Sequence, residues 1–475
     1  MAKSKVLLTG ASGSMGGEAF KELLTRRDKY DIRLLLRPSK VNKGNFTKFE
    51  SYPGVEIVWG DLTSADDCMR AVTGVQFVLH PAAFIAPAAD HKPLEARKIN
   101  TGGTMNLVDA IKAQKHPEDI KLVYVGSVAE YGDRRPPIHM IKVGDPLKPC
   151  VHDHYATTKI DAEKYVMESG LPCWSSIRQT FIAIPNTFGL MDPIMFHQPP
   201  DQHIELITGR DAGFGLVQCM ETPDDFWGRV YNMGGGPRCR VVYMDMMDHM
   251  MKVFGFGDYT KIMDLNWFGR QNFHCGWYAD SWILNEYTGH WRDTLQDYYR
   301  SVEEASPWYL KLGGRIAPNF IVKQVMKRMA DPLKWAQAGN EDFINPFFGS
   351  MEAWKKIPSD WKSYVPKRGE VLDCTDVEGC KQYNVDDLKD YATSRGGELI
   401  SSECGDRCEK VAWKCARGHE FELSPIAAIL GGNWCPECAP PEWDLDGCAD
   451  VDPFFAKFHN RLGCGQVKSI LVEEA

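Results

Sequence analysis

The sequence lacks several features that would point away from a globular enzyme. Its 475 residues contain no run of about 18 uninterrupted apolar residues, so no membrane span is predicted. The first residues lead directly into a short strand-like run at 6–10, without the apolar segment of a signal peptide. With 55 basic and 64 acidic residues, the chain also lacks the positive charge that polyanions attract. We therefore expect a cytoplasmic protein that does not bind nucleic acid.

Cysteine is scarce in the first 369 residues and frequent afterwards. Six of the 15 cysteines lie in that part, whereas the last 102 residues hold nine. The charge divides at the same place, because 21 acidic and 10 basic residues give the chain from Glu370 onward a net charge of −11. Clustered cysteines without a secretion signal favour a metal site over a disulfide framework. A separate unit is therefore expected over 370–475.

The first third of the chain alternates short apolar runs with helical patterns. This alternation predicts an α/β fold, a doubly wound parallel sheet with helices on both faces. The expected strands are 6–8, 32–36, 55–59, 75–80 and 122–125, and helices are expected around 17–25, from Ser64, and near 104–112. A polar loop is expected after 32–36. A small mixed substrate lobe completes a unit over 1–310, and 311–369 is expected to be a helical connector that includes 321–329.

A glycine-rich loop lies between the first strand and the first helix. Gly10, Gly13 and Gly16 are spaced G-x-x-G-x-x-G, which permits a tight turn and close approach of the backbone to a pyrophosphate. The N-terminus of the following helix favours phosphate charge. The loop predicts a dinucleotide site, and the remaining expected contacts within it are Ser12, Ser14 and Met15.

This loop and three further segments resemble the extended short-chain dehydrogenase/reductase family, in its epimerase/dehydratase branch. The segments are Gly60-Asp61-Leu62, His80-Pro-Ala-Ala83 and the stretch from Asn100 to Asn106. The resemblance covers about residues 4–300 and implies a Rossmann-type fold. It further implies that Asp61 and Leu62 contact the adenine, and that Asn100 plays a structural role and orders a proton-relay water.

The residue after the second strand bears on the choice of cofactor. NAD-binding relatives place an acidic residue there for the ribose 2′-hydroxyl, whereas this chain has Arg37, followed by Lys40. A guanidinium suits a 2′-phosphate through charge-assisted bonds. The sequence therefore favours NADP over NAD.

Tyr155 and Lys159 form the family's Y-x-x-x-K pattern, and a spacing of four places both on one helix face. A phenol is a poor acid–base group at neutral pH, and a nearby ammonium is expected to lower its pKa. Ser127, in Gly126-Ser-Val-Ala-Glu-Tyr-Gly132, matches the family's substrate-binding serine. The resemblance implies that these three residues are catalytic and that Tyr155 and Lys159 also contact the cofactor.

Neighbouring residues argue against one reaction of the family. Sugar dehydratases of this branch carry Thr-Asp-Glu where this chain has Ser127, Val128 and Ala129, so the acidic pair required for elimination is missing. His152 and His154 flank Asp153 just before Tyr155. We interpret them as a polar loop that enters the helix, rather than as a second acid–base pair.

The residues that could bind the substrate leave two substrate classes open. An aromatic stretch suits a flat apolar substrate, or else packs in the core; it comprises Trp267, Phe268, Phe273, His274, Trp277 and Tyr278. Arg238, Arg240 and Arg270 could instead bind the diphosphate of a sugar nucleotide.

Near the end of the chain, a C-x-x-x-H pair and a C-x-x-C pair are separated by 15 residues. Cys415, His419, Cys435 and Cys438 would form a closed tetrahedral zinc set, with no position open for catalysis. The segment 385–440 resembles treble-clef zinc ribbons. Cys404 and Cys408 lie close by and could replace a ligand. We expect a structural zinc in a folding, docking or dimer element.

The leading hypothesis is an NADP-dependent oxidoreductase that reduces a carbonyl or oxidises an alcohol, with a small apolar or aromatic substrate. A nucleotide-sugar epimerase using the same three residues is the second hypothesis. A dinucleotide-binding redox sensor with a zinc-ribbon interaction module is the third, and the intact Ser127, Tyr155 and Lys159 argue against it. A homodimer is possible.

Overall fold

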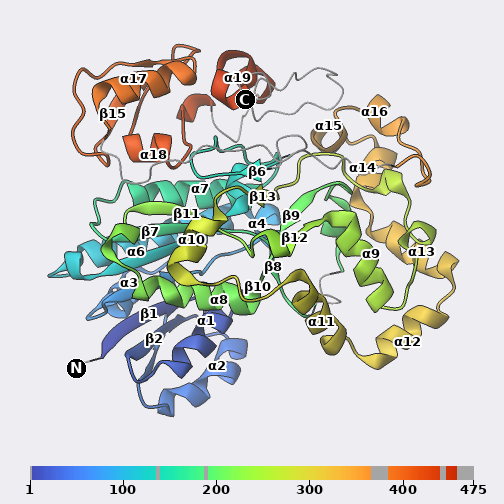
Figure 1. Cartoon of the computed structure of the whole chain (residues 1–475), viewed down its shortest axis with the longest axis horizontal. Helices are drawn as coiled ribbons and strands as arrows, with labels where there is room; N and C mark the ends of the chain where they lie inside the picture. Colours follow the sequence, from blue (N-terminus) through green and yellow to red (C-terminus); the bar gives the residue numbers. More distant parts are fainter. Residues whose placement is uncertain (1–2, 135–139, 187–190, 365–382, 439–444, 457–475) are drawn as a thin grey trace.

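A seven-stranded parallel sheet forms the centre of the N-terminal unit (Figure 1). The computed structural model describes residues 3–134, 140–186, 191–364, 383–438 and 445–456. The strand order is β11-β7-β5-β4-β1-β2-β3, and every neighbouring pair is parallel. The strands are β1 (Ser4–Thr9), β2 (Tyr30–Leu36), β3 (Val55–Trp59), β4 (Phe77–His80), β5 (Lys121–Ser127), β7 (Trp174–Gln179) and β11 (Arg229–Met233).

The strands are apolar on both faces because helices cover both. In β1, Leu7 belongs to one buried cluster, while Val6 and Leu8 belong to another on the opposite face. The first face is covered by α3 (Ala65–Val72), α6 (Gly103–Lys112) and α7 (His154–Met167). The second is covered by α1 (Ser14–Thr25), α8 (Gly209–Gln218) and α10 (Ser281–Thr288). The expected doubly wound α/β fold is confirmed.

The order of the strands reverses between β1 and β4. In sheets of this kind, ligands bind outside the carboxyl ends of the strands at that point. The glycine loop follows β1 there, and after β4 the chain forms α4 (Ala88–His91), α5 (Pro93–Ala96) and a π-helical turn at Arg97–Gly102. The fold therefore brings the cofactor loop and the segment after β4 to one edge of the sheet.

A smaller lobe lies beside the carboxyl edge of the sheet. It contains three two-stranded sheets and a methionine-rich core around α9 (Tyr243–Val253), α11 (Leu295–Ala305) and α13 (Asn319–Met329). The short strands are β6 (Met140–Ile141), β8 (Ile182–Ala183), β9 (His203–Glu205), β10 (Ile207–Thr208), β12 (Arg240–Val242) and β13 (Trp277–Tyr278).

The segment after residue 310 is helical. It forms α12 (Trp308–Ile316), α13, α14 (Asp331–Ala338), α15 (Glu341–Phe348) and α16 (Met351–Lys355). Val322, Met326 and Leu333 belong to the core of the lobe. The indole N–H of Trp361 also donates to the carbonyl oxygen of Met263. These helices therefore extend the lobe.

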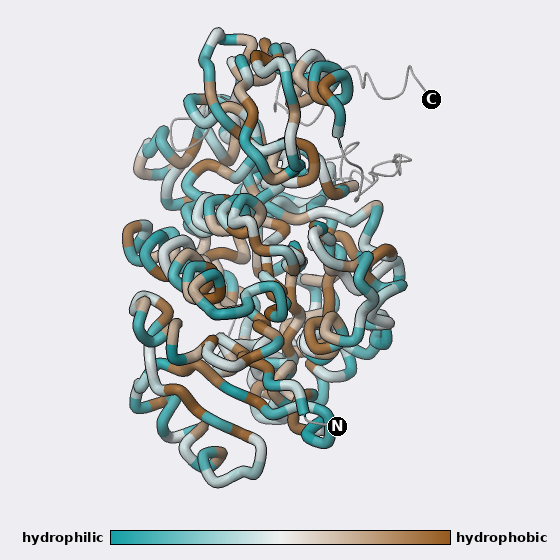
Figure 2. The backbone as a smooth tube through the Cα atoms, turned by 90° about the vertical axis from the view of Figure 1, so that its left-hand side faces the viewer, coloured by the Kyte–Doolittle hydropathy of each residue, from teal (hydrophilic) through white to brown (hydrophobic). Residues whose placement is uncertain are grey.

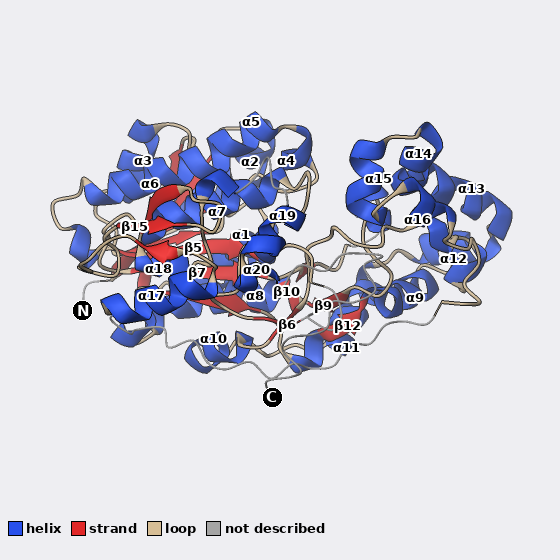
Figure 3. Cartoon of the chain, turned by 90° about the horizontal axis from the view of Figure 1, so that it is seen from above, coloured by secondary structure: helices blue, strands red, loops and turns tan. Residues whose placement is uncertain are grey.

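The C-terminal unit is built on a three-stranded antiparallel sheet. Its strands are β14 (Glu398–Leu399), β15 (Val411–Lys414) and β16 (Glu420–Leu423), with α17 (Val385–Ser394) and α18 (Pro425–Ile429). Two short helices follow, α19 (Leu445–Val451) and α20 (Pro453–Ala456). Seen from above, this unit lies over α7 (Figure 3).

The apolar core of the C-terminal unit is continuous with that of the sheet. One buried cluster contains Leu122 on β5, Val166 on α7, and Trp413 and Ile426 in the C-terminal unit. Hydrophobic stretches accordingly run through the interior of the chain, with hydrophilic ones outside (Figure 2). Helix α7 is therefore buried on two sides, by the sheet and by the C-terminal unit.

Backbone groups hold this interface in register. The amide of Leu147 donates to the carbonyl oxygen of Gly432, at 3.2 Å. The amide of Ser424 donates to the Glu168 carboxylate at the end of α7, at 3.1 Å. Gly432 has φ +70°, and its α-carbon lies against the carbonyl of Asp145. The interface is thus too close for a side chain at this position.

Two local features differ from or extend the expectations. The chain after β2 forms a helix, α2 (Lys40–Phe46), rather than a polar loop, because the Ser39 hydroxyl accepts from the Asn42 amide and caps it. Ser64 caps α3 in the same way, and this helix begins where one was expected. Within the described part of the chain, no helix combines the length and hydropathy required to cross a membrane.

We predict that Gly432→Ala destabilises the protein more than Gly339→Ala. Both glycines have positive φ, +70° and +65°, so alanine costs about 1–2 kcal/mol at either position. Only at Gly432 would the new Cβ also overlap a carbonyl, which adds about 1–3 kcal/mol; at Gly339 it meets nothing within 4 Å. Thermal unfolding and limited proteolysis of the C-terminal unit measure the difference. Equal losses would contradict the close interface.

Candidate functional site

The glycine loop presents a helix N-terminus without a cap. Gly13 is the N-cap of α1, and no side chain accepts a hydrogen bond there. Gly10 has φ +64°, and a Cβ on it would lie 2.8 Å from the Cα of Ala82. Ser12, Gly13 and Ser14 are exposed. The loop is therefore open at the place where a phosphate would accept from the backbone, which fits the expected cofactor.

The remaining residues of the predicted loop are buried below its exposed part. Met15 and Gly16 are buried, and a Cβ on Gly16 would overlap the carbonyl oxygen of Gly10. The missing side chain at Gly16 thus lets the first turn of α1 pack onto the strand–loop junction.

Arg37 is exposed at the carboxyl end of β2 and has no ion-pair partner among the described residues. At the end of β3, the Asp61 carboxylate accepts from the Thr63 amide, at 2.9 Å. Leu62 is partly buried against α6. These residues lie along the same edge as the glycine loop, so the structure brings the predicted cofactor residues together.

Asn100 is 3% exposed and connects two parts of the site. Its side-chain oxygen accepts from the amide of Phe84, at 2.7 Å. Its NH₂ group donates to the carbonyl oxygen of Phe84 and to the hydroxyl of Thr158, both at 2.9 Å. Asn100 therefore ties the segment after β4 to α7, which is a structural role like the one the family resemblance implies.

Ser127 and Tyr155 meet at the carboxyl end of β5. Ser127 ends β5, and Tyr155 lies in the first turn of α7, whose N-cap is Asp153. The Ser127 side chain lies close enough to the Tyr155 phenol to affect its pKa. Tyr155 belongs to a small buried apolar cluster with Ala129, and Phe84 packs against this cluster.

The pKa of Tyr155 differs from the expectation. Burial raises it well above the usual value, and the interaction with Ser127 opposes that rise. The Lys159 ammonium lies 4.2 Å from the centre of the Tyr124 ring. Burial lowers the pKa of Lys159 to about 8, against the attraction of Glu130 and Glu163. Tyr155 is therefore a neutral phenol, able to donate a proton.

A buried charge cluster lies behind Ser127. The carboxylate of Glu130 accepts from the Ser127 amide, at 2.7 Å, and lies 3.2 Å from the Arg178 guanidinium. Arg178 also pairs with Glu163 and donates to the carbonyl oxygen of Gly431 in the C-terminal unit, at 2.8 Å. Burial and the neighbouring Glu163 raise the pKa of Glu130. A chain of polar contacts thus links the C-terminal unit to the backbone of Ser127.

Sequence reasoning missed a second polar group beside Tyr155. Asp90 accepts from the Tyr155 amide, at 3.0 Å, and Nδ1 of His274 lies 2.7 Å from the Asp153 carboxylate. Burial, followed by the Asp153 charge, raises the pKa of Asp90 to about 6. The Cys150 thiol lies in the same group. No short spacing could reveal these contacts, since His274 follows Asp153 by 121 residues.

The aromatic stretch divides between core and site. Trp267 and Phe268 are buried in the lobe core, and Tyr278 is buried near Tyr131. Phe273 and Trp277 are only partly buried, and Phe273 stacks on His274. Core packing therefore accounts for half of this stretch, and Phe273 lies beside the group at the start of α7.

Two of the three arginines considered for a diphosphate, Arg238 and Arg240, are engaged by the protein. Arg240 pairs with the buried Glu205, at 2.8 Å, and also donates to the carbonyl oxygen of Tyr278. Arg238 donates to the carbonyl oxygen of Trp291. These contacts favour a structural role for both side chains.

The four predicted metal ligands converge in the C-terminal unit. The ligand atoms of Cys415, His419, Cys435 and Cys438 all lie within 4.8 Å of one another. Nδ1 of His419 lies 3.6 Å from Cys435 Sγ and 3.4 Å from Cys438 Sγ. Tetrahedral zinc with ordinary bond lengths would separate such atoms by about 3.6 Å. The donor set and its geometry therefore fit a zinc ion.

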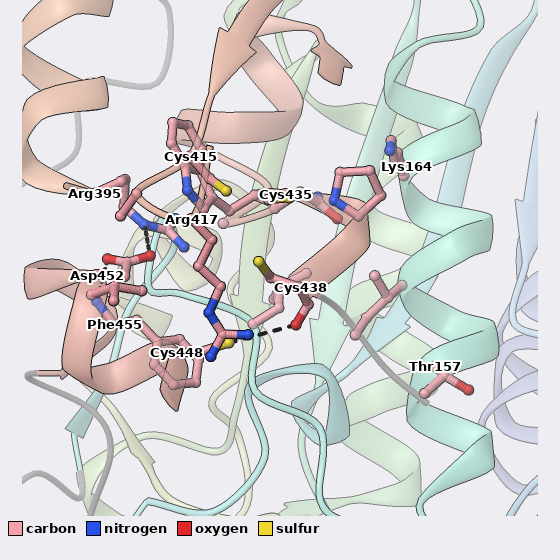
Figure 4. Close-up of a pocket in the computed structure, with 18 of the residues that line it drawn as sticks. Thr157, Lys164, Arg395, Cys415, Arg417, Cys435, Cys438, Cys448, Asp452 and Phe455 are labelled. Carbon is pink, nitrogen blue, oxygen red and sulfur yellow. Dashed lines mark hydrogen bonds and ion pairs between the residues drawn. The ribbon is translucent and has the colours of Figure 1, made fainter. Parts of the chain in front are cut away.

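Neither Cys404 nor Cys408 belongs to this group of ligand atoms, and the Cys404 thiol donates to the carbonyl oxygen of Tyr383. Burial is the largest cause of the raised pKa of Cys435 and of Cys438. A cavity of 160 Å³ lies between the cluster and α7, with Cys415, Cys435 and Cys438 on one side and Thr157 and Lys164 on the other (Figure 4). The candidate metal centre thus lies at the interface with α7.

Sequence comparisons identify a known family over part of the chain. Residues 6–189 match the NAD dependent epimerase/dehydratase family. A 3 beta-hydroxysteroid dehydrogenase/Delta 5-->4-isomerase of Mycobacterium tuberculosis is 30% identical over 227 residues, which cover 44% of this chain and 55% of the relative. Sanguinarine reductase of Eschscholzia californica is 26% identical over 191 residues, or 36% of this chain and 67% of the reductase. The chain thus spans about half the length of the first of these relatives.

Solved structures show the same fold. The dTDP-glucose 4,6-dehydratase DesIV of Streptomyces venezuelae, solved with NAD, has a TM-score of 0.52 at 17% identity and covers 65% of this chain and 98% of its own. The UDP-glucuronic acid 4-epimerase of Bacillus cereus has a TM-score of 0.51 at 18% identity, covering 65% and 99%. Sequence and fold therefore agree that residues 6–189 are similar to the NAD dependent epimerase/dehydratase family and form a Rossmann-type core.

Proposed function

We propose that this protein is an NADP-dependent oxidoreductase that interconverts a carbonyl and an alcohol on an apolar substrate. The observation that carries the proposal is the meeting of Ser127 and Tyr155 at the carboxyl end of β5, beside the open glycine loop. The similarity of residues 6–189 to a family of NAD-dependent enzymes supports the same class of reaction.

The residues of the site have separate roles in the reductive direction. The Ser127 hydroxyl hydrogen-bonds the substrate carbonyl oxygen, and Tyr155 donates its phenolic proton to that oxygen as the alcohol forms. The raised pKa of Tyr155 keeps this proton in place at neutral pH. Lys159 places positive charge beneath the site. The reduced cofactor, when bound, supplies the hydride to the carbonyl carbon.

The cofactor preference rests on the end of β2. Arg37 is exposed there, without an ion-pair partner among the described residues, and Lys40 follows at the start of α2. A 2′-phosphate would accept bidentate hydrogen bonds from the guanidinium. No acidic side chain stands at this position to accept from a ribose 2′-hydroxyl instead.

The proposal of an apolar substrate rests on the apolar side chains near Tyr155. Ala83, Phe84 and Ala86 pack against the apolar cluster that contains Tyr155, and Phe273 stacks on His274 of the lobe. The two relatives are named for activity on a hydroxysteroid and on sanguinarine, and substrates of that kind suit apolar surroundings. The engagement of Arg238 and Arg240 by the protein gives less support to a sugar nucleotide, and so to the epimerase alternative.

The C-terminal unit is proposed to hold one structural zinc ion through Cys415, His419, Cys435 and Cys438. Four protein ligands close the coordination sphere, so the ion would organise the unit without acting on substrate. Because the unit covers α7 and contacts Arg178, its folding would also hold the catalytic helix in place.

We predict that Tyr155→Phe lowers kcat by about 10²–10⁴-fold, because the proton donor is lost, while cofactor binding is retained. Carbonyl reduction followed by nicotinamide absorbance is the assay, with a panel of apolar ketones. Tyr165→Phe is the matched control, since this phenol lies on the same helix but bonds Asp109 at the outer surface. Near-normal turnover in Tyr155→Phe would refute the assignment.

Arg37→Asp is expected to remove most of a preference for NADPH over NADH. A charged hydrogen bond is worth about 1.5–3 kcal/mol, so the ratio of the two kcat/KM values should fall about ten- to a hundred-fold. Lys43→Asp, an exposed charge reversal on α2, should leave the ratio unchanged. A wild-type enzyme that uses both cofactors equally would argue against the role of Arg37.

Metal analysis of the purified protein should find one zinc per chain. Removal of zinc, or Cys435→Ser with Cys438→Ser, should make the C-terminal unit sensitive to protease and lower turnover, because α7 loses one of its two supports. Cys404→Ser with Cys408→Ser is the control and should change neither. A folded C-terminal unit with no bound metal would rule out this site.

A further inference from the structure

Two consecutive helices of the lobe present large apolar side chains to solvent. On α12, Trp308 is 74% and Ile316 is 73% exposed; on α13, Phe320 is 70% exposed. The α12–α13 surface, as we call it, consists of Trp308, Tyr309, Leu312, Ile316, Phe320, Ile321 and Val325. Both helices lie at the edge of the molecule farthest from the C-terminal unit (Figures 1 and 3).

These side chains are not needed for the core. Helix α13 buries Val322 and Met326 in the lobe and turns Ile321 and Val325 outward. Helix α12 buries only Gly314 among its nine residues. Seven of the 16 large hydrophobic residues exposed in the described chain thus lie within 18 consecutive positions. Such a concentration marks an interaction surface.

The same segment is strongly basic. Residues 306–330 contain five lysines and arginines and no acidic residue, in a chain whose net charge is −9. Lys311 and Lys323 are paired with Glu303 and Asp264. The other three cations, Arg315, Lys327 and Arg328, are exposed and have no ion-pair partner among the described residues.

We propose that the α12–α13 surface binds peripherally to anionic lipid membranes. Aromatic and aliphatic side chains of an amphipathic helix enter the boundary between headgroups and acyl chains, while Arg315, Lys327 and Arg328 meet the lipid phosphates. Tryptophan and tyrosine, here Trp308 and Tyr309, suit that boundary because their rings are apolar with one polar group. The contact lies on the membrane surface, in keeping with helices of nine and 11 residues.

Charge favours a lipid surface over a second copy of the chain. In a twofold dimer the same patch meets itself, so the three unpaired cations would face one another with no acidic partner in 306–330. An anionic membrane satisfies the apolar and the charged parts of the surface together. The inference does not depend on the proposed reaction.

The test is cosedimentation of the full-length protein with vesicles of phosphatidylcholine alone and of phosphatidylcholine with phosphatidylglycerol. We expect binding to the anionic vesicles, weakened by salt. Trp308→Ser with Phe320→Ser should abolish it. Charge reversal of Arg315, Lys327 and Arg328 to Glu should weaken it by at least about 100-fold, since the loss of each cation alone costs roughly fivefold.

The control variants match the test variants in the change of net charge and in the exposure of the substituted side chains. Charge reversal of Lys98, Lys112 and Lys115, exposed on the Rossmann unit, and Leu94→Ser, at an 84% exposed position, should leave binding unchanged. Unaltered circular dichroism and thermal unfolding would show that each variant folds. Failure of the wild type to bind anionic vesicles, or equal binding by Trp308→Ser with Phe320→Ser, would overturn the proposal. So would sedimentation velocity showing a dimer that this double variant dissociates, without vesicle binding.

Discussion

Helix α7 is packed between two apolar surfaces, and most of the site depends on that packing. Its inner face meets the sheet through Val166, and its outer side is covered by the C-terminal unit around Ile426. Tyr155 and Lys159 lie in the first half of this helix, so their positions follow from both contacts. Burial on two sides also removes water from the polar groups, which accounts for the raised pKa of Tyr155 and the lowered pKa of Lys159.

A buried arginine couples the two units electrostatically. Arg178 is fully buried and meets two carboxylates, Glu130 and Glu163. An unpaired charge at this depth would be very unfavourable, so the three side chains constrain one another. Since Arg178 also reaches Gly431 and Glu130 accepts from the Ser127 amide, a displacement of the C-terminal unit would be transmitted to the backbone of Ser127. The proposed structural zinc would therefore support the site without touching substrate.

Short-range sequence patterns predicted those elements that depend on residues only a few positions apart. The glycine spacing at 10, 13 and 16 predicted the open turn before α1, because the missing side chains act locally. The start of the helix near Ser64 was predicted for the same reason. The four metal-ligand positions also followed from two short spacings, and the structure brings their atoms together. The helix after β2 was missed, since its cap at Ser39 lies in a polar stretch with little periodicity.

By itself, the sequence predicted the α/β class, the glycine loop before the first helix, the proposed catalytic residues and the proposed metal ligands of the C-terminal unit, because these are encoded in contiguous or closely spaced residues. Only the tertiary structure decided what lies around them. The contact between His274 and Asp153, the link from Gly431 through Arg178 to Glu130, and the contact of Lys159 with the Tyr124 ring join residues far apart in the chain. Such contacts depend on how distant elements pack, and no local spacing encodes that packing.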